Sequence, residues 1–342
     1  MKINLNKYFT KKHNLKPLIV AEISANHNGS KKVFLNSIKS AAKYGADLVK
    51  IQTYEADDIS INKKFLIRNK ETNIWKLYKK AQTPYSWHHD AFKLSKKLGI
   101  ELFSTPFSLK AVKFLKQFKV KLFKISSFEI TDLRLVEEIA KTKKPIILST
   151  GMASLKEIKK CIKTINKYHK KIILLHCVSG YPTSEKQSNL RRINSLKQVF
   201  NYNVGLSDHT NDIITSLTAV SLNAVLIEKH FIINKNMNSL DKKFSIDPQQ
   251  LLSLNKMVER VKDSLGSGNF QLQNDEKKSI KYRRSIFSIK KISKGEKLTA
   301  NNISTFRPEI GLPADKFKNI LGKRLRKSLV AFSPIFKKDL FN

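Results

Sequence analysis

The stretch YNVGLSDHTNDIITSLTAVSLNAVLIEKHF, residues 202–231, contains one pattern twice. An apolar run over residues 202–206 leads to His209, and a second run over residues 224–227 leads to His230. Each run is typical of a buried strand, and a helical pattern lies between them over residues 212–222. Each His therefore stands where a predicted strand ends. Two imidazoles on neighbouring strand ends could bind one divalent metal ion.

Apolar runs of this kind alternate with helical patterns over most of the chain. The eight runs are residues 17–23, 46–52, 100–103, 121–125, 145–149, 171–176, 202–206 and 224–228. Eight strand–helix units in about 250 residues predict a (β/α)₈ TIM barrel, an α/β fold. A doubly wound open sheet is the alternative. It would need a glycine-rich loop after the first strand, where residues 25–30 hold a single Gly.

Two segments depart from this alternation. Residues 53–83 show no clear strand pattern, and a loop of this length favours a lid or an insertion. Residues 266–282 are rich in Gly, Ser, Asn and Gln, which indicates a linker. We therefore predict a catalytic barrel over residues 1–265, a linker over 266–282 and a small domain over 283–342. That small domain, with a predicted strand over 285–289, is expected to dock on its own barrel or on a partner's.

The charge balance is strongly basic, with 66 Lys and Arg against 27 Asp and Glu and a formal net charge of +39. Nucleic-acid binding is the alternative from a different class of function. However, only ten of the basic residues are Arg, the residue that base-reading proteins prefer, and the Lys residues are spread along the chain. An excess of positive charge would also attract anionic substrates such as phosphates.

Three features of the sequence predict a cytoplasmic protein that does not enter a membrane. The start, residues 1–16, has no apolar segment typical of a secretory signal. No apolar run approaches the roughly 20 residues that span a bilayer. Only two cysteines are present, Cys161 and Cys177, as expected of a chain from a reducing compartment.

Polar side chains follow every predicted strand, at the end of a TIM barrel where chemistry takes place. In chain order they include Glu22, Lys50, Gln52, Thr105, Lys124, Ser127, Glu129, Ser149, Tyr181, Ser207, His209 and His230. A single residue of this kind is often only a helix cap. Together, the two lysines and the hydroxyls suit a substrate with a phosphate and a carboxylate. The carboxylates, with Asp241 further along, suit acid–base work or contacts to sugar hydroxyls.

The lysines also permit a second chemistry, that of a Schiff-base aldolase. Such a lysine needs burial or a neighbouring cation to lower its pKa. The His pair favours a metal enzyme instead, since a Schiff-base enzyme needs no metal. His27 and His176 are weaker candidates for metal binding.

The motifs resemble those of the sialic acid synthase family, which condenses phosphoenolpyruvate with an N-acetylated amino sugar to make a nonulosonic acid. The residues that carry the resemblance are AEISANHNGS (21–30), KIQT (50–53), STPF (104–107), STGM (149–152), GLSDHT (205–210) and EKHF (228–231). The small last domain is similar to the antifreeze-like, or SAF, domain of that family.

This resemblance implies a role for each matching residue. His209 and His230 would bind a divalent metal, usually Mn²⁺, with Mg²⁺ and Co²⁺ as alternatives. The implied contacts to phosphoenolpyruvate are Lys50, Thr105, Lys124, Ser127, Ser149 and Ser207. The implied contacts to the sugar are Glu22, Gln52, Tyr181 and Asp241, and Glu129 would lie near the metal-bound water. Arg307 would enter the active site of a partner subunit, which implies a homodimer.

The choice of sugar depends on a few positions. Phe128 stands where sialate synthases usually carry Gly, and it favours the pseudaminic acid synthase branch, whose substrate is 2,4-diacetamido-2,4,6-trideoxy-L-altrose. An apolar side chain beside the sugar suits a methyl group in place of a hydroxyl. The alternative is a synthase of N-acetylneuraminate or legionaminate, acting on N-acetylmannosamine or a related sugar. Ser179, where sialate synthases often carry Asn, leaves one sugar contact open.

Overall fold

The structure, a computed structural model, describes residues 3–10 and 15–341. It divides into two compact units, Met1–Gly266 and Ser267–Asn342. Of the predicted domain bounds, residues 1 and 342 lie outside the described part of the chain.

Among the described residues of the first unit, eight parallel strands close into a barrel in the order β1-β10-β9-β8-β7-β6-β5-β2. The strands are β1 (Leu18–Glu22), β2 (Leu48–Thr53), β5 (Glu101–Pro106), β6 (Phe123–Ile125), β7 (Ile146–Ser149), β8 (Ile172–Cys177), β9 (Asn203–Asp208) and β10 (Leu226–His230). The predicted TIM barrel is therefore confirmed. The doubly wound alternative is wrong, because the sheet closes on itself.

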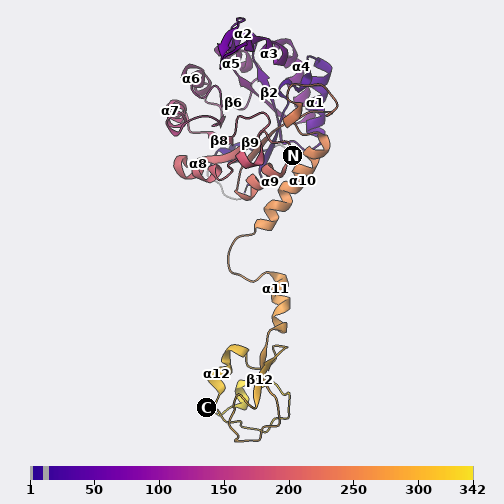
Figure 1. The fold of residues 1–342 in the computed structure, drawn as a ribbon, viewed down its shortest axis with the longest axis vertical. Coiled ribbons are helices and arrows are strands. Elements are labelled where there is room, and N and C mark those ends of the chain that lie inside the picture. The colour runs from indigo at the N-terminus through magenta and orange to yellow at the C-terminus, as the bar shows by residue number, and fades with distance from the viewer. Residues whose placement is uncertain (1–2, 11–14, 342) are drawn as a thin grey trace. The chain divides into compact units, whose positions relative to one another are not determined.

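Helices follow the strands and lie outside them, as Figure 1 shows for α6, α7 and α8. They are α1 (Lys31–Lys43), α4 (Tyr85–Leu98), α5 (Leu109–Lys116), α6 (Leu133–Lys141), α7 (Leu155–Asn166), α8 (Arg192–Phe200), α9 (Ile214–Ser221) and α10 (Pro248–Leu265). The first helix begins well before residue 37, where the apolar pattern becomes clear. Its start is fixed by Ser30, whose hydroxyl accepts a hydrogen bond from Val33 N at 3.4 Å.

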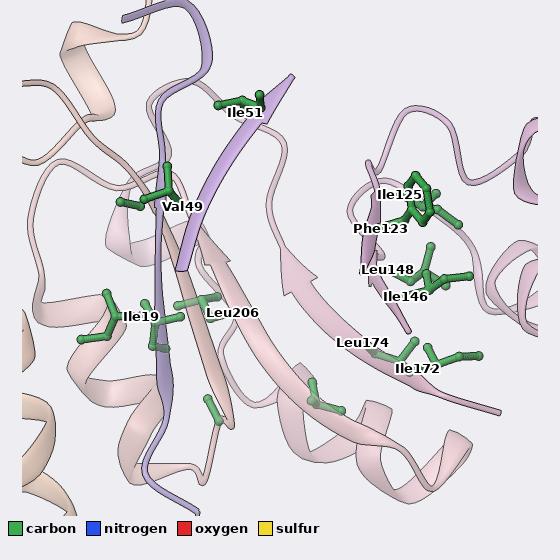
Figure 2. Close-up of a cluster of buried hydrophobic side chains, with 14 of the residues drawn as sticks. Ile19, Val49, Ile51, Phe123, Ile125, Ile146, Leu148, Ile172, Leu174 and Leu206 are labelled. Carbon is green, nitrogen blue, oxygen red and sulfur yellow. The ribbon is translucent and has the colours of Figure 1, made fainter. Parts of the chain in front are cut away.

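Apolar side chains alternate between the two faces of each strand. In β7, Ile146 and Leu148 belong to the larger core cluster, between strands and helices, whereas Ile147 belongs to the cluster inside the barrel. Figure 2 shows such outer side chains on several strands. Each buried aliphatic side chain stabilises the fold by roughly 1.5–3 kcal/mol.

The inner cluster is closed at one end by the start of the chain. The short 3₁₀ helix Leu5–Phe9 places the buried ring of Tyr8 against the inner cluster. The Tyr8 hydroxyl donates to Lys16 O at 2.8 Å, and Asn203 Nδ2 donates to Tyr8 O at 2.9 Å. These contacts lie at the amino ends of the strands. The carboxyl ends are thus left as the open mouth of the barrel.

The insertion after β2 contains regular structure that the sequence did not predict. It holds α2 (Ala56–Ile59), the antiparallel hairpin β3 (Phe65–Ile67) and β4 (Lys70–Thr72), and α3 (Ile74–Ala81). The expectation of no strand here is wrong. The two strands have three residues each, too few for a period to show, and the turn residues Arg68 and Asn69 have φ of 49° and 62° without the usual glycine.

The second unit is built around a short antiparallel ladder, β11 (Ser285–Ser288) with β12 (Ile303–Phe306). The predicted strand over 285–289 is thus confirmed. This unit also contains the short helices α11 (Asn274–Ser279) and α12 (Phe317–Ile320). A separate apolar cluster supports it, formed by Ile286, Ile292, Leu298, Ile303, Ile320, Leu325, Leu329, Ile335 and Leu340. Across both units, no helix within the described residues is long and apolar enough to cross a membrane.

Candidate active site

The strand period places one polar layer on top of the apolar inner layer. Because alternate residues of a strand share a face, the step from Val20 to Glu22 in β1 keeps the side chain inside the barrel. The step from Leu122, just before β6, to Lys124 within β6 does the same. The same step from inner apolar residues places further side chains there, namely Lys50, Ser149, Cys177 and Glu228. Residues predicted from their place at strand ends thus converge on the barrel interior.

Two cations and two carboxylates form the deepest part of this layer. Lys50 Nζ lies 2.7 Å from Glu22 Oε2 and 3.6 Å from Glu228 Oε1. Lys124 Nζ lies 3.5 Å from the same oxygen of Glu228. None of the four side chains is more than 5% exposed. The sequence prediction missed Glu228, although its spacing of two residues from His230 on one strand indicated an inward side chain.

Burial and charge compete at each of these groups. Burial alone would raise the pKa of Glu228, but Lys124 and Lys50 outweigh it and hold that pKa well below its usual value. Burial would lower the pKa of Lys50, yet Glu22 and Glu228 raise it overall. The pKa of Lys124 stays lowered, because burial and the charge of Lys50 outweigh the attraction of Glu228.

Hydroxyl groups surround the charged cluster. Lys50 Nζ donates to Thr105 Oγ1 at 3.2 Å, and Ser207 Oγ donates to Glu228 Oε1 at 3.0 Å. Ser149 Oγ is buried and has no hydrogen-bond partner among the described residues. A buried hydroxyl without a partner is costly unless a ligand completes its hydrogen bonds.

Ser127 lies at the same level through contacts with β8 and the loop after β7. Its hydroxyl accepts a hydrogen bond from Gly151 N at 3.0 Å and contacts Cys177 Sγ at 3.4 Å. Cys177 Sγ in turn lies 3.7 Å from Ser179 Oγ. Cys177 was not predicted as a site residue. Like Cys161, it is buried and forms no disulfide.

The two histidines face each other at the mouth of the barrel. Their ring centroids are 5.4 Å apart. His230 is the last residue of β10, and His209 follows directly after β9. The Nδ1 of His209 lies 3.0 Å from the carbonyl oxygen of Val178, so Nδ1 carries the proton and the lone pair of the ring lies on Nε2. His230 Nδ1 is buried, 3.4 Å from Asp241 Oδ2, without a hydrogen-bond partner among the described residues.

This arrangement fits a metal ion with an open coordination shell. Each ring has a nitrogen that is not engaged with the backbone, and one His is oriented by a carbonyl in the way metal-bound imidazoles usually are. In the described part of the chain, no group of three or more His, Cys, Asp and Glu is placed to hold a metal. An ion bound by the pair would therefore complete its shell with water or substrate oxygens.

Glu129 and Phe128 lie on the loop after β6. Glu129 accepts a hydrogen bond from the Ser126 hydroxyl. Burial raises the pKa of Glu129 to about 7, even though Lys124 acts to lower it. Phe128 is 57% exposed, although it is a large apolar side chain. An exposed phenylalanine beside a polar site is available to contact a substrate.

The remaining predicted sugar contacts of the barrel also lie near the His pair or Glu22. The Tyr181 ring packs on His209 with centroids 4.5 Å apart. Gln52 Nε2 donates to Glu22 Oε1 at 3.2 Å and to Ser24 Oγ at 2.9 Å. Asp241, beside His230, also accepts from Ala25 N at 3.2 Å. Ser24 was not predicted.

Arg307 is the predicted site residue that the barrel does not contain. It follows β12 in the second unit, and its side chain is exposed. Its role toward a partner subunit stays a prediction.

The two weaker histidine candidates have other partners. His176 precedes the inward Cys177 on β8, so it points outward, and its Nε2 lies 2.7 Å from Ser188 O. His27 is fully buried, packs against Trp87 and contacts the Thr83 hydroxyl through Nε2 at 3.3 Å. Both are structural residues in this fold.

Comparison with known families agrees with this geometry. The profile of the NeuB family matches residues 37–270, and that of the SAF domain matches residues 283–340. The chain belongs to the NeuB family. The predicted resemblance to sialic acid synthases with a C-terminal SAF domain is confirmed.

Members with curated functions are similar over nearly the whole chain. The pseudaminic acid synthase of Helicobacter pylori is 41% identical over 337 residues, which cover 95% of this chain and 98% of that protein. The N,N'-diacetyllegionaminic acid synthase of Campylobacter jejuni is 39% identical over 324 residues, which cover 92% and 97%.

A solved structure shares the fold as well. The N-acetylneuraminic acid synthetase of Leptospira borgpetersenii, determined in complex with citrate, is 33% identical with a TM-score of 0.70. The match covers 77% of this chain and 90% of that one. The NeuB family and these relatives together show that the chain is a phosphoenolpyruvate-dependent synthase.

Proposed function

We propose that this NeuB-family enzyme is a pseudaminic acid synthase that condenses phosphoenolpyruvate with open-chain 2,4-diacetamido-2,4,6-trideoxy-L-altrose. The methylene carbon of phosphoenolpyruvate forms a bond to the aldehyde carbon, whose oxygen takes up a proton. Water adds to C2 of the phosphoenolpyruvate unit, and the bond from that carbon to the phosphate oxygen then breaks. The products are the nine-carbon 2-keto acid and inorganic phosphate, so all atoms are accounted for.

The observation that carries this proposal is the buried cation pair with its hydroxyls. Inside the barrel, the ammonium groups of Lys50 and Lys124 both lie within 3.6 Å of Glu228 Oε1. The Ser149 hydroxyl in this layer has no hydrogen-bond partner among the described residues. Phosphoenolpyruvate carries a phosphate and a carboxylate, and both bind most strongly to ammonium and hydroxyl donors out of water. The lysines would hold both anionic groups throughout the reaction.

The His pair is the proposed binding site of a divalent metal, with Mn²⁺ as first choice and Mg²⁺ or Co²⁺ as alternatives. When bound, such an ion acts as a Lewis acid on the sugar aldehyde. His209 and His230 supply nitrogen ligands, and the Val178 carbonyl keeps His209 in the tautomer that can bind.

Glu129 is the proposed base for the attack of water. A base works best when its pKa lies near the working pH, and burial raises the pKa of Glu129 to about 7. Ser126 orients the carboxyl through its hydroxyl. Glu129 would accept the proton that water loses as its oxygen bonds to C2.

Phe128 supports a 6-deoxy sugar. Its exposed ring lies one residue from the proposed base, where it could pack on the methyl group of the substrate. A hydroxyl in place of that methyl would lose its hydrogen bonds to water against the ring. The similarity to the Helicobacter pylori enzyme, at 41% identity, points the same way.

A legionaminate synthase is the second candidate, because the Campylobacter jejuni relative of that name is only slightly less similar, at 39%. The Schiff-base alternative has one supporting observation, the lowered pKa of Lys124. It is the weaker of the two, since the NeuB family matches more than half of the chain.

The working unit is proposed to be a cytoplasmic homodimer in which the SAF domain of each subunit serves the partner's active site through Arg307. A domain of this size has a small core, and its exposed Arg can recognise carboxylate or acetamido oxygens of the sugar. The two buried, unpaired cysteines suit a reducing compartment.

A competition assay tests the choice of sugar. Purified enzyme receives Mn²⁺, phosphoenolpyruvate and equal amounts of the 2,4-diacetamido altrose, the corresponding legionaminate precursor and N-acetylmannosamine. Phosphate release gives the rate, and mass spectrometry identifies the products. We expect the pseudaminic product to dominate and turnover to stop on exhaustive chelation.

Three results would contradict parts of the proposal. Preference for another sugar would reassign the substrate within the family. Full activity without metal would remove the role of the His pair. Borohydride trapping of a covalent adduct on Lys124 would favour the Schiff-base mechanism.

A further inference from the structure

A buried ion pair lies directly behind the two histidines. Asp208 precedes His209, Lys229 precedes His230, and the two are paired in the ladder between β9 and β10. Since His230 and Glu228 point inward, Lys229 points outward, toward the helices. Neither Asp208 nor Lys229 has more than 1% of its side chain exposed. Because the pair lies on the outer face of the strands, it is separate from the inward cluster of Lys50 and Lys124.

The pair binds the loop that carries His209 to the strand that carries His230. Lys229 Nζ lies 3.1 Å from Asp208 Oδ2 and donates to Thr210 O at 2.5 Å. Asp208 Oδ1 accepts from both the amide and the hydroxyl of Thr210, each at 2.8 Å. Asp208 Oδ2 accepts from Ser216 Oγ of α9 at 2.6 Å. These four residues are called the clamp: Asp208, Thr210, Ser216 and Lys229. Two of them, Asp208 and Thr210, are the direct neighbours of His209 in the chain.

The backbone does not fix the two histidines to each other. Within the described residues, the ladder between β9 and β10 ends at Asp208 and Lys229, one position before each His. His209 is held from the β8 side, where Thr183 N donates to His209 O at 3.0 Å and Nδ1 contacts Val178.

Stability alone does not explain a buried ion pair. Replacing such a pair by apolar residues of similar volume is often neutral or stabilising by about 1–4 kcal/mol. A buried pair at this place, one residue from each His, is better explained by what it positions. Residues that orient metal ligands without touching the metal change metal affinity by about 10–100-fold when mutated.

We propose that Asp208 and Lys229 are positioning residues that fix the spacing of His209 and His230 and thereby set the affinity of the site for a divalent cation. The inference rests on the proposed metal role of the His pair. Both side chains point away from the barrel interior that holds Lys50 and Lys124. Their contribution lies in holding two ligands at one distance before the metal arrives, so that binding does not have to order the loop.

Mn²⁺ binding to the full chain tests this directly, without substrate. The free Mn²⁺ signal in electron paramagnetic resonance gives Kd, and urea unfolding gives stability. Lys229→Met should weaken Mn²⁺ binding about tenfold to a hundredfold and lower stability, because it leaves Asp208 buried and unpaired. The double variant Asp208→Asn with Lys229→Met should regain stability and still bind Mn²⁺ weakly.

Two controls separate positioning from stability. Leu254→Ala removes a buried side chain of α10, so it should destabilise the barrel and leave the Kd for Mn²⁺ unchanged. Ser216→Ala removes one hydrogen bond to Asp208 and should weaken binding mildly if Lys229→Met does not fold. Wild-type affinity in the stable double variant, or weakened affinity in Leu254→Ala, would overturn the positioning role.

The proposed metal site fails in a different way. If Mn²⁺ does not bind the wild type, or binds equally to His209→Ala, the His pair is not the metal site and the inference falls with it. If binding is lost in His209→Ala but unchanged in both clamp variants, only the inference fails.

Discussion

Glu129 is a carboxyl group of the site whose pKa lies near neutral pH. Burial raises its pKa to about 7, and a base is active only when ionised. We therefore expect kcat/KM for phosphate release to rise as the pH passes upward through about 7. Glu129→Gln should lower kcat by about 10²–10⁴-fold and remove this rise.

The same shift has a consequence for stability. The folded-state pKa of Glu129 lies above its ordinary value of 4.5, so the protonated folded state is favoured. The stability from this group is present below pH 4.5 and is lost as the pH rises to about 7, and Glu129→Gln should remove that loss. Asp132→Asn is the control. It should keep the rate and move the inflection slightly downward, because Asp132 adds to the raised pKa.

Single residues of the site could be predicted where the strand period applied. Lys50, Lys124 and His230 lie on strands, so their inward direction follows from alternation with apolar neighbours. Glu228 was missed as a site residue although it ends the predicted strand over 224–228, and the same period places it inside the barrel. Phe128 and Tyr181 lie on loops, where no period indicates direction.

At the scale of elements, Gly205 of β9 shows why one strand position must lack a side chain. A Cβ there would lie 2.3 Å from Leu226 O of the neighbouring strand and 2.8 Å from Leu175 Cδ2. We expect Gly205→Ala to lower the free energy of unfolding by about 3 kcal/mol, since backbone cannot move aside cheaply. Urea unfolding measures this loss.

Gly99 provides the matched control for this substitution. It ends α4 with φ of 72°, and an added Cβ would meet nothing within 4 Å. Gly99→Ala should cost about 1 kcal/mol through its left-handed backbone alone. Gly205 has no positive φ, so only the close approach of β9 to β10 requires glycine there. A loss in Gly205→Ala no larger than that in Gly99→Ala would therefore contradict this requirement.

The predicted elements were right where hydrophobic runs were long. All eight barrel strands were found, because buried parallel strands are continuous apolar runs. The hairpin β3–β4 was missed, since its strands are short and its apolar residues, such as Leu66, are exposed. A strand that buries nothing leaves no pattern of burial in the sequence.

At the scale of the whole molecule, the sequence indicated two units but not how they cooperate. The barrel and the SAF domain each have their own apolar cluster. The charges that steer an anionic substrate are distributed along the entire chain, with a formal net charge of +39. Assignment of Arg307 to a partner's active site came from family resemblance, because neither period nor burial connects an exposed residue of the second unit to a site in the barrel.

Mixing two inactive variants tests that assignment. His209→Ala should inactivate its own barrel and leave its SAF domain functional. Arg307→Ala should leave the barrel intact and make the SAF domain non-functional. In a dimer that exchanges its SAF domains, a mixed pair combines an intact barrel with an intact Arg307 across the interface. We expect unfolding and refolding the two variants together to restore phosphate release, while each variant alone stays inactive.

A chain with both substitutions, refolded with Arg307→Ala, must stay inactive, because no subunit then supplies the arginine. If the first mixture is also inactive although light scattering shows dimers, each SAF domain serves the barrel of its own subunit.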